Sequence, residues 1–314
     1  MNGWLLALLQ TGLMIAAAPL LSGWVKWCKC KFQNRQGAAP WQTYRDLGKL
    51  FRKEIVVAAN ASTIFRIAPY IVFSVTALAC SVIPLVAPNL PTSALADAIV
   101  LVGFFALGRF FLALAGMDIG TAFGGMGSSR EMTISSLAEP AMLLAIFTLA
   151  MSVSSTNLST MISALLQRPF QLYPSFIFAA MGLVLVAVAE TGRIPVDNPA
   201  THLELTMVHE AMILEYCGRH LALMEWAAMI KLLLYGVLLV NLFVPWGMAT
   251  SLTPPDLLVA ALLLLIKLML LGFVLAAAES GLAKMRLFRI PQLLGLAFIL
   301  SLLGMLSHVI LEVR

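Results

Sequence analysis

The ionisable residues of this chain gather in one stretch, from Glu190 to Glu225. It holds six of the 15 acidic residues and three of the four histidines, but only two arginines. Clustered carboxylates in a partly dry site raise one another's pKa values and can then exchange protons near neutral pH. The stretch is therefore a candidate proton-transfer site, and its acids are Glu190, Asp197, Glu204, Glu210, Glu215 and Glu225.

The histidines and cysteines lack the spacing of a metal site. No His-Glu-x-x-His motif occurs, and Cys28-x-Cys30 has neither the two-residue spacer nor a second cysteine pair. The sequence predicts ordinary thiols and no metal ligands. Asp197 or Asn198, followed by Pro199, suits a helix start, which would place His202 and His209 on one helical face.

Composition indicates the setting of this stretch. The 314 residues are 61% hydrophobic and 11% charged, and the mean hydropathy is +0.95. A soluble domain carries about 25% charged residues, so the chain is predicted to be an all-α, polytopic membrane protein. The net charge of +5 is explained by basic loops beside a membrane and not by nucleic acid. The apolar N-terminus has no basic region before it and is predicted to be a retained first span.

A membrane-spanning helix needs about 20 mostly apolar residues. Eight segments satisfy this approximately: Gly3–Val25, Thr63–Ala87, Leu95–Gly116, Ile134–Ser155, Pro174–Ala189, Trp226–Met248, Pro255–Ala278 and Ile290–Leu311. No connection is long enough to bury a core of its own, so residues 1–314 are predicted to form a single integral membrane domain.

The charge of the connections predicts an orientation. The first loop is strongly basic, from Lys26 to Lys53, and the last carries Lys284, Arg286 and Arg289. The loops after the second and sixth spans carry no lysine or arginine. Basic loops face the cytoplasm, so the acidic stretch is predicted on the cytoplasmic side of the cell inner membrane, with both termini outside.

Four charged residues fall inside predicted spans: Arg109, Glu139, Lys231 and Lys267. Each costs about 2.5–3.5 kcal/mol near the centre of a spanning helix. One interpretation is a buried polar chain of the kind that proton carriers use. For Lys231 and Glu139, near the cytoplasmic ends, the alternative is a side chain that reaches the membrane surface.

The second inner loop is rich in glycine, with Gly120, Gly124, Gly125 and Gly127. It lacks the Gly-Lys-Ser/Thr of a phosphate loop, and no strand precedes it. The sequence predicts a re-entrant or tightly packed turn here, covered by protein or water.

Several motifs resemble those of one family, the large membrane-anchor subunit of respiratory complex I and of energy-converting [NiFe]-hydrogenases. They are Glu190-Thr191-Gly192-Arg193-Ile194-Pro195-Val196-Asp197, Glu215-Tyr216-Cys217-Gly218 and Glu279-Ser280. The first loop (Asn34 to Gly37, Tyr44 to Leu50) and Gly127-Ser128-Ser129-Arg130-Glu131 look like the formate hydrogenlyase and hydrogenase-4 branch. Val196, Cys217 and Ala200-Thr201-His202 depart from the family pattern, since relatives carry more acids in the last of these runs.

The resemblance implies a non-catalytic subunit that couples redox chemistry to protons. Its expected partners are hydrogenase large and small subunits, iron–sulfur subunits and antiporter-like membrane subunits, with the nickel–iron site and the clusters held by those partners. Under this resemblance the proton-coupling residues are Glu190, Asp197, Glu204, Glu210 and Glu215, continued by Glu139, Arg109, Lys231 and Lys267. The docking residues would be Arg35, Arg45, Asp46, Lys49, Asp118, Arg130, Glu131 and Arg193.

Two other functions remain open from the sequence. A quinone-site subunit of a complex I-like NADH dehydrogenase would bind quinone, which the hydrogenase branch does not require. A self-sufficient secondary transporter usually shows two similar halves, and this chain shows no convincing internal repeat.

Overall fold

The long apolar segments form helices, as the hydropathy predicts. The structure is a computed structural model that describes residues 3–88, 90–167, 173–197 and 207–312. Seven segments of the described chain are long and apolar enough to cross a membrane: α1 (Gly3–Phe32), α3 (Thr63–Val82), α4 (Ala98–Asp118), α5 (Ala122–Val153), α9 (Gly218–Phe243), α10 (Pro254–Gly281) and Leu287–Leu311, which contains α11 (Ile290–Ser307).

The remaining predicted span corresponds to α7 (Pro174–Glu190). This helix has 17 residues, at the lower limit for crossing a bilayer. No β-strand occurs in the described residues, so the all-α, polytopic membrane fold is confirmed. Which side of the membrane the termini face stays a prediction.

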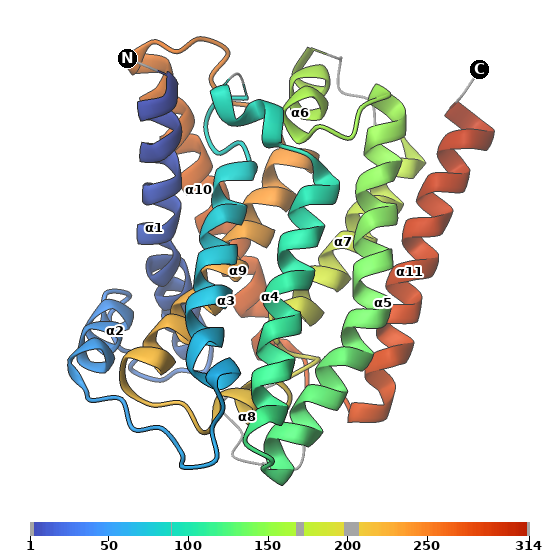
Figure 1. Cartoon of the computed structure of the whole chain (residues 1–314). Coiled ribbons are helices and arrows are strands. Elements are labelled where there is room, and N and C mark those ends of the chain that lie inside the picture. The colour runs from blue at the N-terminus through green and yellow to red at the C-terminus, as the bar shows by residue number, and fades with distance from the viewer. Residues whose placement is uncertain (1–2, 89, 168–172, 198–206, 313–314) are drawn as a thin grey trace.

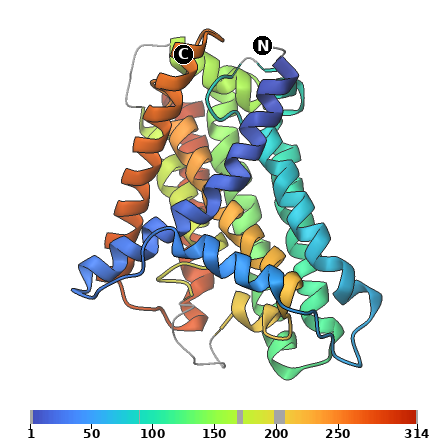
Figure 2. The same ribbon diagram turned by 90° about the vertical axis from the view of Figure 1, so that its left-hand side faces the viewer.

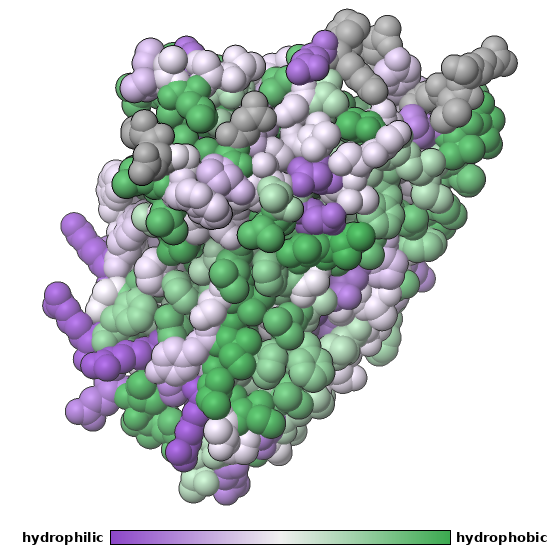
Figure 3. Space-filling view, turned by 45° about the horizontal axis from the view of Figure 1, so that its top comes forward, coloured by the Kyte–Doolittle hydropathy of each residue, from purple (hydrophilic) through white to green (hydrophobic). Residues whose placement is uncertain are grey.

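The spanning helices form one bundle with short elements at each end (Figure 1). α1 packs against α10 and α9, α3 against α4 and α9, and α11 against α5 and α7. Hydrophobic side chains cover much of the side of the bundle, and hydrophilic side chains project near one end (Figure 3). This distribution suits a lipid-facing wall.

Two helices that the span count did not include lie at the lower end of Figure 1, α2 (Gln42–Arg52) and α8 (His209–Ile213). α2 lies across the bundle, roughly perpendicular to the spanning helices (Figure 2). We call this end, with the basic first loop and the acidic stretch, the inner end. The short helices α6 (Leu158–Gln167) and η1 (Pro91–Leu95) lie at the opposite end. η3 (Leu287–Arg289) precedes α11, and a wider turn, His308–Glu312, follows it.

The glycine-rich segment is helical, so the prediction of a re-entrant or tightly packed turn there is wrong. α5 begins at Ala122, and the Thr121 hydroxyl accepts a hydrogen bond from the Gly124 amide. A Cβ atom at Gly124 would lie 2.2 Å from the Gly116 carbonyl oxygen. The glycine therefore allows α4 and α5 to approach closely at their junction.

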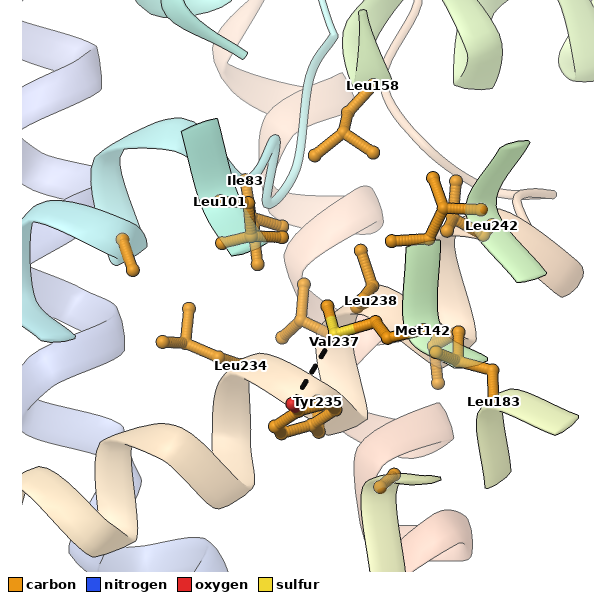
Figure 4. Packing of buried hydrophobic residues seen from close by; sticks show 14 of the residues in the cluster. Ile83, Leu101, Met142, Leu158, Leu183, Leu234, Tyr235, Val237, Leu238 and Leu242 are labelled. Carbon is orange, nitrogen blue, oxygen red and sulfur yellow. Dashed lines mark hydrogen bonds between the residues drawn. The ribbon is translucent and has the colours of Figure 1, made fainter. Parts of the chain in front are cut away.

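The centre of the bundle is apolar, with one polar hydroxyl inside it. Tyr235 of α9 stacks on Phe105 of α4, with ring centroids 5.0 Å apart. Its hydroxyl donates to the Met142 sulfur across 3.4 Å, as Figure 4 shows. Around it pack leucine, isoleucine and valine side chains from α3, α4, α7 and α9. This core separates the polar inner half of the bundle from the opposite end.

Candidate functional site

Arg109 of α4 joins three carboxylates inside the bundle. Its side chain is 3% exposed. One guanidinium nitrogen, Nη1, donates to Glu139 Oε1 across 2.8 Å, and Nη2 donates to Glu190 Oε2. Arg109 Nε lies 3.5 Å from Glu131 Oε1. Because the carboxylates come from α5 and α7, one guanidinium ties three helices together.

Two more residues complete this group, which we call the Arg109 cluster (Arg109, Glu131, Ser135, Glu139, Glu190 and Lys231). Lys231 Nζ of α9 lies 2.9 Å from Glu190 Oε2. The Ser135 hydroxyl donates to Glu139 Oε1 across 2.8 Å and accepts from Arg109. Two cations thus face three carboxylates. Like charges this close are unfavourable, so the cluster can take up one proton on a carboxylate.

The exposure of the three carboxylates is graded. The side chain of Glu190 is 2% exposed, that of Glu131 12% and that of Glu139 30%. Glu139 therefore lies at the side wall of the bundle, on a helix of membrane-spanning length. A carboxylate there is costly against lipid, so it is a natural point of contact with another polar group.

A cavity of about 70 Å³ borders the cluster. Its polar lining comes from Arg109, Glu131, Glu190, Asp197, His209 and Lys231. The cavity thus connects buried charges of the bundle with residues of the acidic stretch at the inner end. Its size and its polar lining suit ordered water.

Asp197 holds the acidic stretch together at the cavity. The residue is 2% exposed. Its Oδ2 accepts a hydrogen bond from the Val208 amide across 3.1 Å, and its Oδ1 lies 2.9 Å from Lys284 Nζ. One carboxylate therefore joins the chain before residue 198 to the chain after residue 207 and to the last inner loop.

A second ion network lies nearby at the inner end. Glu279, at the end of α10, has a side chain that is 3% exposed. Its two oxygens lie 3.0 Å from Lys29 Nζ of α1 and 3.3 Å from Arg193 Nη1. The Glu279-Ser280 motif thus serves to tie α10 to α1 and to the turn that follows α7.

The predicted proton-coupling residues are only partly brought together. Glu190, Glu139, Arg109 and Lys231 meet in the cluster, and Asp197 lines its cavity. Glu210 is partly exposed and Glu215 is exposed, and neither lines the cavity. Glu204 and His202 lie outside the described residues, as does the predicted helix start at Asn198 and Pro199.

Lys267 does not join the cluster. Its Nζ donates to the backbone carbonyls of Val244, across 2.7 Å, and of Trp246. α9 ends at Phe243, and carbonyls beyond a helix end have no partner within the helix. The position of Lys267 in the middle of α10 is therefore explained by capping of the neighbouring helix.

The predicted docking residues divide into two groups. Arg35, Arg45, Asp46 and Lys49 are exposed on the first loop and α2. The others make contacts within the chain: Asp118 accepts from the Ser62 amide, Arg130 donates to the Met207 carbonyl, and Arg193 pairs with Glu279. Glu131 faces Arg109 and belongs to the cluster, away from the docking surface where its place in the inner loop had put it.

The Glu215-Tyr216-Cys217-Gly218 motif anchors the loop between α2 and α3. The Tyr216 ring stacks on Phe65 with centroids 3.9 Å apart, and its hydroxyl donates to the Phe65 carbonyl. Burial raises the pKa of the Tyr216 hydroxyl, with Asp118 acting in the same direction. The Val56 amide donates to Cys217 Sγ across 3.0 Å. The motif therefore has a structural use next to α9.

The sequence interpretation missed Ser135 and the role of Glu131. A signal was present, because Glu131, Ser135 and Glu139 follow one another at intervals of four residues. On a helix this spacing places side chains on one face. The glycine-rich loop that was expected around Glu131 hid this periodicity.

No group of three or more histidine, cysteine, aspartate or glutamate side chains in the described chain is arranged to hold a metal ion. What the geometry offers is a set of linked ionisable groups beside a polar cavity. Such a set can store and move protons.

Comparisons with known proteins agree with the motifs. The family model described as NADH dehydrogenase matches residues 5–310. The chain is 31% identical over 300 residues to formate hydrogenlyase subunit 4 of Escherichia coli (strain K12), covering 96% of this chain and 97% of that protein. It is 32% identical to hydrogenase-4 component C of the same organism, with 95% and 93% covered.

A more distant relative belongs to the NADH-quinone oxidoreductase of Rhodospirillum rubrum. One of the subunits of that oxidoreductase is 27% identical over 274 residues, with 86% of this chain and 79% of the relative covered. The fold resembles a chain in the structure of the membrane-bound sulfane sulfur reductase, an archaeal respiratory membrane complex. The TM-score is 0.83 at 17% identity, over 98% of this chain and 99% of that one. Together, the family match across almost the entire sequence and the two bacterial relatives above 30% identity show that the chain belongs to the NADH dehydrogenase subunit 1 family.

Proposed function

We propose that this chain is the membrane-anchor and proton-coupling subunit of a membrane-bound [NiFe]-hydrogenase complex of the formate hydrogenlyase type. The observation that carries the proposal is the Arg109 cluster, in which one guanidinium and Lys231 hold three carboxylates inside a membrane-spanning bundle. Ionisable groups at this depth are costly and mark ion or proton pathways.

The relatives favour the hydrogenase branch. The two hydrogenase-related proteins match more of the chain, and at higher identity, than the relative from the NADH-quinone oxidoreductase does. We infer that the partners include hydrogenase large and small subunits, iron–sulfur subunits and antiporter-like membrane subunits. These partners would hold the nickel–iron site and the clusters. The complex would lie in the cytoplasmic (inner) membrane with the inner end towards the cytoplasm.

In this function the inner end receives the peripheral arm and the cluster transmits its redox state. The exposed charges of Arg35, Arg45, Asp46 and Lys49 would form part of the docking surface. A charge change near the inner end would alter how favourably the cluster binds its extra proton. Glu139, at the side wall, would pass the proton to an antiporter-like neighbour.

The test replaces the most buried carboxylate of the cluster. Glu190→Gln keeps the size of the side chain and removes its charge. In inverted membrane vesicles containing the intact complex, the number of protons translocated per hydrogen formed should fall about tenfold or more. Glu54→Gln, an exposed carboxylate of the same inner end, is the matched control and should leave this ratio unchanged. An unchanged ratio in Glu190→Gln would disprove the coupling role.

A second candidate, the quinone-site subunit, is favoured by a different observation. An apolar cavity of about 150 Å³ between α1, α7, α9 and α10 shares Val25 with a cavity of about 420 Å³ at the inner end. The larger cavity is lined by Lys26, Lys29, Arg193 and Glu279, among others. An apolar passage beside a polar chamber suits an amphiphile such as quinone. Quinone reduction by the purified complex, lost on Arg193→Gln, would favour this candidate over the first.

A further inference from the structure

Three buried polar atoms with no hydrogen-bond partner border the same cavity. They are Nε of Arg109, Oε1 of Glu190 and Nε2 of His209, and all three residues line the 70 Å³ space. An orphaned buried polar atom costs about 1–3 kcal/mol, so three at one cavity indicate a ligand that serves them all. A cavity of this volume takes about five water molecules, which can donate and accept as each atom requires.

His209 occupies the inner boundary of this cavity. The residue is partly exposed, whereas its Nε2 atom is buried, so the imidazole ring extends from the inner end into the cavity. Glu210 and Glu215 of the same stretch do not line the cavity. Asp197 does, but its carboxylate is engaged by Lys284 and by the Val208 amide.

The backbone around His209 is firmly held. Before it, the Met207 carbonyl accepts from Arg130, and the Val208 amide donates to Asp197. After it, Ala211, Met212 and Ile213 are buried. A Cβ atom at Gly116 or Gly127 would lie 3.1 Å from Met212 Cγ, so the small residues of α4 and α5 admit α8 close to the cluster. The ring is therefore kept at the cavity by packing.

We propose that His209 is the residue through which protons reach the Arg109 cluster, by way of water molecules held in the cavity. This inference rests on the proposed proton-coupling function and assigns its uptake step. A proton binds one ring nitrogen, and the proton on the other nitrogen leaves to the neighbouring water, so the ring carries no net change. The water chain delivers the proton to the excess carboxylate of the cluster.

The surroundings of His209 suit such a relay. Burial lowers the pKa of the His209 imidazole, and Lys231 acts in the same direction, while Glu210 and Asp197 oppose them. The ring is therefore neutral near pH 7, with one nitrogen that donates and one that accepts. Arg130 of α5 is the further charged group held against this segment. A neutral imidazole can pass protons in either direction.

The experiment uses the intact complex in inverted membrane vesicles, with the rate of proton translocation followed by acridine-dye fluorescence and divided by the amount of assembled complex. His209→Gln and His209→Ala should each lower this rate roughly 10²-fold, the loss typical of a missing acid–base group. Millimolar imidazole should restore His209→Ala, in which the ring's space is open, and leave His209→Gln slow. His220→Gln is the matched control, because His220 is buried beside Tyr70 and Tyr216 and does not line the cavity.

Three outcomes contradict the proposal: an unchanged rate in both His209 variants, an assembled His209→Ala complex that imidazole does not restore, or an equal loss in His220→Gln. If His209→Ala fails to assemble, His209→Gln decides alone. Glu190→Gln is measured in parallel. A loss in Glu190→Gln with none in His209→Gln removes the relay and keeps the coupling function, whereas no loss in Glu190→Gln removes the function itself.

Discussion

Lys231 of α9 and Glu190 of α7 form an ion pair of 2.9 Å in the inner half of the bundle. The carboxylate oxygen that Lys231 contacts also accepts from Arg109. Both partners are largely buried, with side chains 19% and 2% exposed. The pair therefore connects the helix that ends in the acidic stretch to the helix that follows it.

Removing the lysine should weaken both folding and coupling. Lys231→Met leaves Glu190 with one cation in a dry site, and breaking a buried pair from one side costs about 3–5 kcal/mol. Arg109 remains, so the lower end of this range is expected. The melting temperature of the solubilised complex should fall. The double variant Lys231→Met/Glu190→Gln should recover part of the loss, and a purely additive double variant would show that the pair is not coupled.

Gly218 should not tolerate a side chain. Its φ is +55°, and a Cβ atom would lie 2.3 Å from the Glu54 carbonyl oxygen. Gly218→Ala adds about 1–2 kcal/mol for the left-handed backbone alone, before the clash with the loop is relieved. We expect less of this chain in membranes by immunoblot. Gly48→Ala on α2, where a Cβ atom meets nothing within 4 Å, serves as the control and should be neutral or stabilising.

Stability should depend on pH through His209. Burial lowers the pKa of this imidazole in the folded state, while in the unfolded chain it is about 6.5. Below about pH 6.5 the unfolded state binds more protons, so stability falls as the pH falls, by at most about 1.4 kcal/mol per pH unit until the folded pKa is reached. Above about pH 6.5 this contribution is flat.

Melting temperatures of the solubilised complex between pH 5 and 8 measure the effect. His209→Gln should have a flatter curve than the parent below about pH 6.5. Parallel curves for the two proteins would show that His209 is not buried as a neutral ring.

Lys267 separates the sequence hypothesis from the structural interpretation. As a cap for the carbonyls of Val244 and Trp246 it acts through hydrogen bonds, at about 1.5–3 kcal/mol for a charged donor. Lys267→Gln, which retains a donor, should keep the proton-to-hydrogen ratio, and Lys267→Met should lower the melting temperature without altering that ratio. A lower ratio in both variants would restore Lys267 to the proton path.

Glu215 provides a graded comparison with Glu190. The sequence hypothesis places it in the proton path, so Glu215→Gln should weaken coupling. Since its side chain is exposed and does not line the cavity, the loss should be smaller than in Glu190→Gln. Equal losses in the two variants would mean that protons reach the cluster past Glu215. The measurement is the proton-to-hydrogen ratio of each assembled complex.

The sequence by itself determined the class of fold, the spans and the family. Long apolar segments cannot remain in water and must satisfy their backbone groups as helices in lipid, so hydropathy alone located the helices. The motifs around Gly192 and Gly218 were recognisable because they need fixed local geometry. Charge also singled out Glu190, Glu139, Arg109 and Lys231, since ions inside apolar spans are exceptional.

Only the tertiary structure decided which of these charges meet. Arg109 and Glu190 lie 81 positions apart, and their helices are apolar on every side. In a bilayer the lipid-facing and the buried faces are equally apolar, so hydropathy carries no information on how each helix is rotated. Packing turned Glu131 towards Arg109, turned Lys267 towards the end of α9, and brought His209 to the cavity beside Glu190.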